Sequence, residues 1–230
     1  MKLTFLGNES GFGVHHTNAY FYDDGNLVFI DLSMSNIEKA KKLISTVSKN
    51  IYIVITHMHD DHFSGVTLFS QFCFYVNGIS PHIVVPEELM EDILTEFKIK
   101  GMGEGVAAIC SLSEYSFPWM KKVIPTTHAP ELDGKCFGYE FLVNGVKVVY
   151  TGDTNTLDDF MPFVKPGCEF YVDMSFDYGK VHLLWDDVKK QLRNISTTSD
   201  VYLMHVDNID KAKDETKHSN IEVVKTSEWV

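Results

Sequence analysis

The segment Thr-His-Met-His-Asp-Asp-His-Phe-Ser-Gly, at residues 56–65, constrains this chain more than any other. It places His57, His59, Asp61 and His62 directly after the apolar run 51–55, and it holds three of the ten histidines of the chain. Neutral imidazole nitrogens and carboxylate oxygens are good ligands for zinc and its first-row neighbours. Because a turn that leaves a buried strand can direct alternate side chains toward one point, the segment predicts a metal site at the end of a strand.

Three further candidate ligands lie later in the chain, and each follows a strand-like apolar run. They are His128, Asp153 and His205. Taken alone, each could be an ordinary core or surface residue. The spacing His-x-His-x-Asp-His, however, resembles the signature of the metallo-β-lactamase superfamily, and these three residues come in the order of that family's remaining ligands. The resemblance extends over nearly the whole chain.

The resemblance implies a four-layer αββα sandwich, an α/β (α+β) fold that residues 1–230 would form as a single domain, with metals at one edge of the two sheets. It also implies two divalent metal ions as cofactors. Zinc is the expected ion, although manganese and iron share the same ligands. In the family pattern the first ion would be held by His57, His59 and His128, and the second by Asp61, His62 and His205, with Asp153 as the bridge.

Local patterns favour strands and helices in alternation. Asp24-Gly25 and Asn144-Gly145 are hairpin turn signals, and each lies between two strand-like runs. Ser35 is followed three residues later by Glu38, which is the spacing of a capping box. Apolar residues then recur at helical spacing. We expect a loop over residues 207–220 and a final strand over residues 221–224.

Three features resemble the branch of the superfamily that contains ribonuclease Z and cyclic-nucleotide phosphodiesterases. The segment that begins at His128 leads to Gly-Tyr at residues 138–139, and Thr-Gly-Asp-Thr occupies residues 151–154. Asp173 is followed by His182. This third feature discriminates best, because the branch uses an acidic residue and a later histidine near the leaving group.

That branch implies a metal-dependent hydrolase, a phosphodiesterase of small nucleotides, cyclic ones included, or of a related phosphodiester. A hydroxide bridging the two ions would attack phosphorus, and Asp61 would orient it or take its proton. His182, steadied by Asp173, would protonate the departing ribose oxygen. A lactonase or thioester hydrolase of the same fold is the alternative, and it would have less need of His182. His15 and His16 could contact a phosphate or base, or be exposed loop residues.

Charge and chain length argue for a small substrate rather than long nucleic acid. The net charge is −12, and the only dense basic clusters are at residues 39–42 and 121–122. Val172 occupies the position where tRNA-processing members usually have a histidine. The stretch from Asp153 to Asp173 is too short for the arm with which those members grip tRNA.

The remaining expectations concern location and assembly. No apolar run is long enough to cross a bilayer, and the N-terminus is typical of a strand rather than of a signal peptide. The four cysteines form no Cys-x-x-Cys pair and are expected to be buried thiols in a reducing compartment. We therefore expect a cytoplasmic protein without membrane contact, and the family resemblance favours a homodimer.

Overall fold

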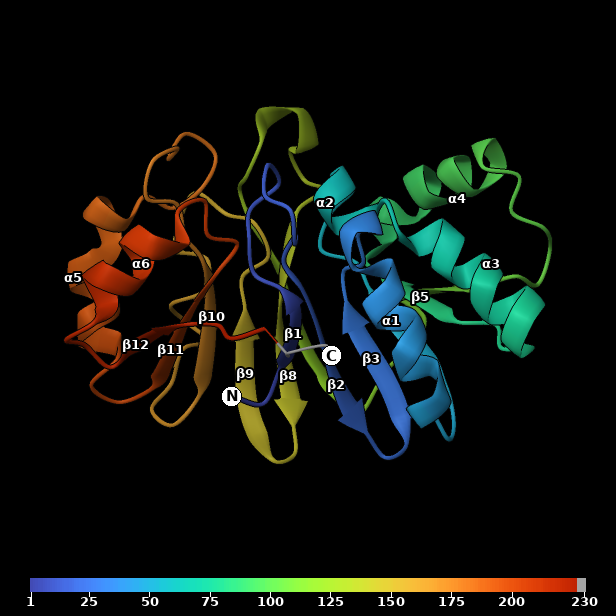
Figure 1. Cartoon of the computed structure of the whole chain (residues 1–230), viewed down its shortest axis with the longest axis horizontal. Coiled ribbons are helices and arrows are strands. Elements are labelled where there is room, and N and C mark those ends of the chain that lie inside the picture. Colours follow the sequence, from blue (N-terminus) through green and yellow to red (C-terminus); the bar gives the residue numbers. More distant parts are fainter. Residues whose placement is uncertain (227–230) are drawn as a thin grey trace.

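The computed structural model describes residues 1–226, which form two six-stranded sheets between outer layers of helices (Figure 1). The first sheet contains β1 (Thr4–Gly7), β2 (Asn18–Asp23), β3 (Asn26–Ile30), β4 (Ile51–Val54), β5 (His82–Val85) and β6 (Ala108–Ser111), in this order. Its first three strands are antiparallel, and β3 to β6 run parallel.

The second sheet repeats this plan with the C-terminal half of the chain. Its strands are β7 (Met120–Pro125), β8 (Phe137–Val143), β9 (Val146–Tyr150), β10 (Glu169–Asp173), β11 (Asp200–Met204) and β12 (Ile221–Val223). Strands β7 to β9 are antiparallel, and β9 to β12 run parallel. The carboxyl ends of parallel strands meet at one edge of a sheet, so both sheets can present the residues that follow their strands.

Helices cover the outer face of each sheet. The N-terminal half contributes α1 (Ile37–Leu43), α2 (Asp60–Phe63), α3 (Val66–Asn77) and α4 (Met90–Ile99), and the C-terminal half contributes α5 (Trp185–Ile195) and α6 (Ile209–Thr216). In Figure 1, α1 and α3 lie on one side of the sandwich and α5 and α6 on the other. Short 3₁₀ turns occupy Met34–Asn36, Ile44–Thr46, Glu87–Leu89 and Pro130–Leu132. The layers are those of the predicted αββα sandwich, so the predicted fold is confirmed.

Aromatic side chains fill the space between the two sheets. The ring centroids of Phe21 on β2 and Phe141 on β8 are 5.7 Å apart, and those of Phe5 on β1 and Tyr171 on β10 are 5.6 Å apart. Tyr171 is fully buried there. Since β3 and β4 are covered on both faces, their sequences are almost continuously apolar rather than alternating.

The local predictions fare unevenly. Both hairpins form, and positive φ angles at Asp24 (45°) and Asn144 (49°) match the turn type that Asp-Gly and Asn-Gly favour. The capping box is wrong, because Ser35 lies inside a 3₁₀ turn, where its Oγ is 2.8 Å from Ser33 Oγ, and α1 begins only at Ile37.

The loop expected over residues 207–220 is also wrong, because α6 occupies most of it. Asn208 caps this helix by accepting a hydrogen bond from the Lys211 backbone N–H at 3.0 Å. Only Ala212 and Thr216 are buried in the helix, so its apolar stripe is too narrow to detect from the sequence pattern. The final strand is confirmed as β12.

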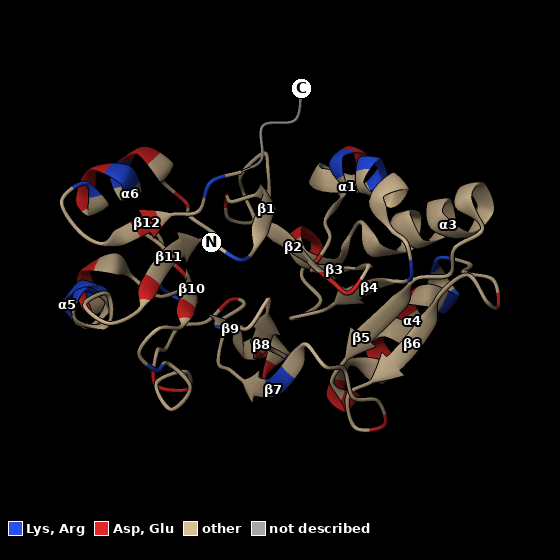
Figure 2. Cartoon of the chain, turned by 90° about the horizontal axis from the view of Figure 1, so that it is seen from below, with Lys and Arg blue, Asp and Glu red and all other residues tan. Residues whose placement is uncertain are grey.

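Charged residues lie mainly on the outside of the sandwich. In Figure 2, Lys and Arg residues on α1, α5 and α6 alternate with Asp and Glu residues. The four cysteines are buried free thiols, as expected. Among the described residues, no helix has both the length and the apolar character needed to cross a bilayer.

Candidate metal centre

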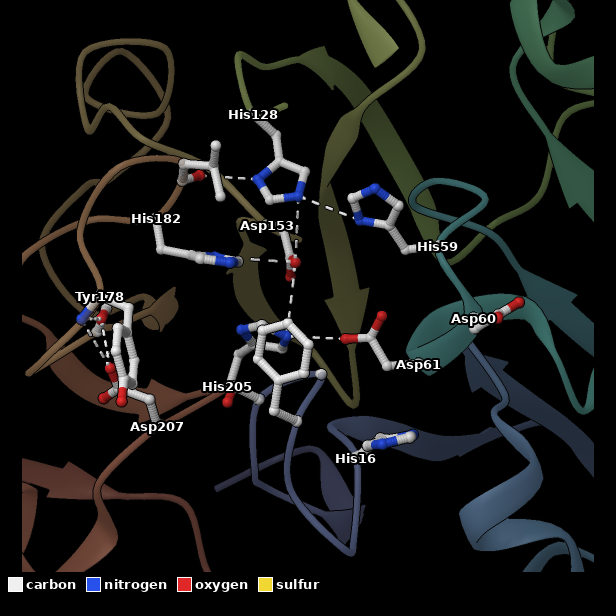
Figure 3. A pocket seen from close by; sticks show the side chains of 15 residues that line it. His16, His59, Asp60, Asp61, His128, Asp153, Tyr178, His182, His205 and Asp207 are labelled. Carbon is white, nitrogen blue, oxygen red and sulfur yellow. Dashed lines mark hydrogen bonds and ion pairs between the residues drawn. The ribbon is translucent and has the colours of Figure 1, made fainter. Parts of the chain in front are cut away.

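The seven predicted ligands meet at one edge of the sandwich, although they come from both sheets. His57 and His59 follow β4, and α2 carries Asp61 and His62. The others each follow a strand of the second sheet: His128 after β7, Asp153 after β9 and His205 after β11. Figure 3 shows side chains from the two halves turned toward one another across a pocket.

The ligand atoms form two groups that share one carboxylate. The first group is His57, His59, His128 and Asp153, and the second is Asp61, His62, Asp153 and His205. Within each group the atoms lie within 4.8 Å of one another. Asp153 Oδ2 is 3.6 Å from His128 Nε2, and Asp153 Oδ1 is 3.2 Å from His62 Nε2. The two groups are those that the resemblance implies.

Hydrogen bonds behind the imidazoles fix which nitrogen faces the cluster. His128 Nδ1 donates to the Val181 carbonyl oxygen at 2.7 Å, and His57 Nδ1 lies 3.0 Å from Thr56 Oγ1. His62 Nδ1 lies 2.8 Å from Asp31 Oδ2. Each of these contacts leaves Nε2 for the cluster, which is the usual arrangement behind metal-binding histidines.

Asp31 supports the cluster, and the sequence analysis did not identify it. It is completely buried, and its carboxylate accepts hydrogen bonds from Thr56 N at 2.8 Å and Thr56 Oγ1 at 2.7 Å as well as facing His62. Its φ is +58°, an uncommon value for a residue other than glycine. Its only signal in the sequence is its place directly after the apolar strand β3, a position that is also typical of an ordinary strand end.

Asp153 is held in place by the glycine before it. Gly152 has a φ of +60°, and a Cβ at this position would lie 2.7 Å from the Phe137 carbonyl oxygen. A residue with a side chain would therefore push β9 and β8 apart at the point where Asp153 turns into the cluster.

Asp173 connects the predicted His182 to the cluster. Its Oδ2 accepts hydrogen bonds from His182 Nδ1 at 2.8 Å and Thr154 N at 2.9 Å, while Oδ1 lies 3.2 Å from His205 Nδ1. Because Nδ1 of His182 is engaged, its Nε2 is the nitrogen available to the pocket that this residue lines. One buried carboxylate thus positions both His182 and the candidate ligand His205.

The electrostatics of the two groups differ. Burial lowers the pKa of His57 and of His59, which favours the neutral imidazole that binds metals. Burial alone would also lower the pKa of His62 and His205, but the nearby Asp153 and Asp61 carboxylates outweigh it. Together with Asp173 beside His205 and Asp31 beside His62, they raise the pKa of His205 to about 10 and that of His62 well above its usual value. This concentration of negative charge favours a cation among these side chains.

The donor set therefore fits metal ions. His62 Nε2 is buried, 3.1 Å from Asp61 Oδ2 and 3.2 Å from Asp153 Oδ1, yet it forms no hydrogen bond with any described residue. In the other group, His59 Nδ1 lies 3.1 Å from His57 Nε2 and 3.3 Å from His128 Nε2. Imidazole nitrogens that converge on one another and on a shared carboxylate in this way are a donor set typical of a zinc site.

The two histidines of the β1–β2 loop have different positions. His16 lines the pocket with the candidate ligands, whereas His15 is exposed. Burial lowers the pKa of His16. Figure 3 places the His16 ring near the side of the pocket where Asp61 lies.

The fold and the histidine–aspartate cluster together define a metal-dependent hydrolase of the metallo-β-lactamase fold. Solved structures share this fold at low sequence identity. YhfI from Bacillus subtilis has a TM-score of 0.78 and 16% identity, covering 99% of this chain and 98% of that one. A diphosphatase of the PhnP family has a TM-score of 0.74 and 18% identity, covering 98% and 94%. The short form of human tRNase Z has a TM-score of 0.68 and 14% identity, covering 99% and 97%.

Sequence comparison then gives the particular family. A UPF0173 metal-dependent hydrolase of Staphylococcus aureus is 28% identical over 172 residues, which cover 72% of this chain and 68% of that protein. The family model described as anti-Pycsar protein Apyc1 matches residues 1–230. The chain belongs to this anti-Pycsar Apyc1 family.

Proposed function

We propose that this protein hydrolyses the phosphodiester of a cyclic mononucleotide with two divalent metal ions. The observation that carries the proposal is the place of Asp153, whose carboxylate belongs to both ligand groups, beside the hydrogen-bonded pair of His182 and Asp173. The first feature supports a two-metal site, and the second supplies a proton donor for an alkoxide leaving group. Family membership supports the same substrate class.

The seven side chains divide between two ions as their grouping indicates. We assign His57, His59 and His128 to the first ion, Asp61, His62 and His205 to the second, and Asp153 to both. When bound, such ions lower the pKa of water toward neutrality and offset the charge that develops on phosphoryl oxygens. Zinc is the proposed ion because imidazole nitrogens make up most of the donor set.

Asp61 is the proposed orienting group for the attacking water. Its Oδ2 accepts a hydrogen bond from His205 Nε2 at 3.0 Å and lies 3.1 Å from His62 Nε2. Its second oxygen, Oδ1, takes no hydrogen bond from a described residue and is available to a water. Asp61 also lines the pocket, where it can orient that water and accept its proton.

His182 is the proposed general acid. As the water oxygen bonds to phosphorus, the bond from phosphorus to one ribose oxygen breaks, and that oxygen takes a proton from His182 Nε2. Burial alone would lower the pKa of His182, but the adjacent Asp173 carboxylate raises it above its usual value. The product is a nucleoside monophosphate with one free ribose hydroxyl.

Size and charge support a small substrate rather than long nucleic acid. The pocket has a volume of about 460 Å³, which suits a mononucleotide. Basic residues on the outer helices are interspersed with acidic ones, whereas a protein that binds long nucleic acid presents clustered Lys and Arg. We propose a cytoplasmic location, which the four buried free thiols support, and a homodimer, which the resemblance to related phosphodiesterases supports.

A panel of four substrates tests the proposal. The metal-loaded protein is assayed with a 3′,5′-cyclic nucleotide, bis-p-nitrophenyl phosphate, a lactone and a thioester. We expect turnover of the two phosphodiesters. Turnover of the lactone or thioester, with neither phosphodiester cleaved, would contradict the proposal and favour the alternative hydrolase classes of this fold.

A further inference from the structure

Two exposed aromatic side chains border the pocket that contains the candidate metal ligands. Phe12 is fully exposed, and 73% of the surface of Tyr178 is exposed to solvent. Both residues line the same pocket as Asp61 and His182. Among the described residues, neither ring packs against another aromatic ring. Single exposed apolar side chains are common on protein surfaces, but aromatic side chains that line a pocket beside polar groups are typical of a small-molecule site.

The loop that carries Phe12 is held close to the cluster. It joins β1 to β2, and the Glu9 carboxylate accepts hydrogen bonds from Val14 N at 2.7 Å and His15 N at 2.6 Å. A Cβ at Gly11 would lie only 2.9 Å from Asp61 Oδ2. Since glycine allows this close approach, the loop passes directly beside the Asp61 carboxylate and fixes Phe12 at the pocket.

The loop that carries Tyr178 is held by a second carboxylate. Asp207 accepts hydrogen bonds from three successive backbone N–H groups, those of Phe176 at 2.7 Å, Asp177 at 3.0 Å and Tyr178 at 3.1 Å. Ser175 Oγ also donates to it. Figure 3 shows Tyr178 beside Asp207 at the side of the pocket away from Asp61.

The two loops are also tied to the same short segment after His205. Ser10 N donates to the Val206 carbonyl oxygen at 3.2 Å, and Val206 N donates to the Asn8 carbonyl oxygen at 3.0 Å. The next residue is Asp207, which anchors the other loop. Hydrogen bonds therefore hold the backbone of both loops in place. This lowers the entropic cost of binding a ligand between or against the two rings.

We propose that Phe12 and Tyr178 bind the nucleobase of the substrate by stacking. The inference rests on the proposed function, because it is the cyclic phosphate that must lie at the metal ligands. The ribose and base then extend from the cluster toward the mouth of the pocket, where the two rings offer flat apolar faces. Each nucleobase has a π face that can stack on an aromatic side chain.

The test compares a cyclic nucleotide with an analogue that lacks the base. Phe12→Ala and Tyr178→Ala are assayed in the metal-loaded enzyme with a 3′,5′-cyclic nucleotide and with methyl riboside 3′,5′-cyclic phosphate. We expect each variant to raise the KM for the nucleotide about tenfold more than the KM for the baseless analogue, the size expected for one lost base–aromatic stack. Phe12→Trp keeps an aromatic ring at this position and should therefore keep the wild-type KM for the nucleotide. Tyr75→Ala removes an aromatic ring on α3 whose exposure is close to that of Tyr178, and it should change neither KM.

The outcomes separate this inference from the proposed function. If the wild-type enzyme cleaves the nucleotide but the alanine variants shift both KM values equally or leave both unchanged, stacking is overturned and the proposed function stands. A changed elution volume in gel filtration without a selective KM effect would also overturn stacking, and would assign the rings to a contact between copies of the chain. If the metal-loaded wild-type enzyme cleaves neither compound, the proposed function fails and the stacking role fails with it.

Discussion

The two halves of the sandwich contribute to the cluster in different ways. The N-terminal half supplies His57, His59, Asp61 and His62 from one turn and the short helix α2. The C-terminal half supplies residues from separate parts of the chain, four of them at or just after the ends of β7, β9, β10 and β11 and one, His182, in the loop that follows β10. They are His128, Asp153, Asp173, His182 and His205.

The N-terminal part of the site therefore depends on local sequence, and the C-terminal part depends on the packing of the sheets. The candidate ligands of the N-terminal half are placed by a single turn and supported from behind by Asp31. The C-terminal residues converge only because β7, β9, β10 and β11 end at the same edge. Both halves meet at Asp153, so a change there should affect the two ligand groups together.

The largest effect is expected at Asp153, the carboxylate that the two groups share. Asp153→Ala should lose both metal ions and all measurable turnover, because a bridging carboxylate offsets the repulsion between two cations as well as supplying oxygen ligands. Elemental analysis and the phosphodiesterase assay measure the two effects. Asp158→Ala is the matched control, since it removes an exposed carboxylate from the same segment. A variant at position 153 that keeps one ion and its turnover would show that the halves act independently.

Asp61 tests the chemistry assigned to the N-terminal half. Asp61→Asn should lower turnover by at least about 10²-fold, the scale of losing a general base or a group that orients the nucleophile. The amide keeps the size of the side chain and removes its charge. Asp60→Asn, at the neighbouring exposed residue of the same pocket, should have little effect. If Asp61→Asn kept near-normal turnover at full metal occupancy, Asp61 would have no role in orienting the attacking water and would only be a structural neighbour of the metal site.

His182 tests the chemistry assigned to the C-terminal half. His182→Ala should lose roughly 10²-fold in turnover of a cyclic nucleotide and much less on bis-p-nitrophenyl phosphate, with both ions still bound. The reason is that a ribose alkoxide needs a proton to leave, whereas nitrophenolate leaves readily without one. Equal losses on the two substrates would indicate a binding or folding role instead.

The smallest effect is expected behind the N-terminal ligands, at Asp31. Asp31→Asn should weaken metal affinity by about 10-fold to 100-fold, as changes behind metal-binding histidines usually do. Asparagine tolerates the positive φ of this position, so the backbone need not change. Metal titration measures the effect, and Asp24→Asn, another aspartate with positive φ but exposed, is the control. Unchanged affinity would mean that the turn alone positions His57 and His62.

The same difference between the halves explains how much the sequence could predict. His57, His59, Asp61 and His62 could be identified from spacing alone, because the turn that positions them is contiguous. His128, Asp153 and His205 required the resemblance to a known family, since no local pattern shows which strand ends will be neighbours. Asp173 and His182 likewise could be identified only through the resemblance to a known family.

What the sequence missed depends on packing between distant segments. Asp31 ends an ordinary apolar strand, and its role exists only because Thr56 and His62 fold back onto it. Asp31 and His205 both have positive φ angles, of 58° and 55°, which no residue type signals in advance. The helix α6 escaped prediction because only Ala212 and Thr216 of its residues are buried.

The metal content of wild-type protein purified without chelator tests the two-metal site most directly. We expect two transition-metal ions per chain, because Asp153 belongs to both groups of candidate ligands. Elemental analysis together with protein quantification gives this ratio. A reproducible value of one ion or fewer, not raised by added zinc or manganese, would contradict the two-metal site.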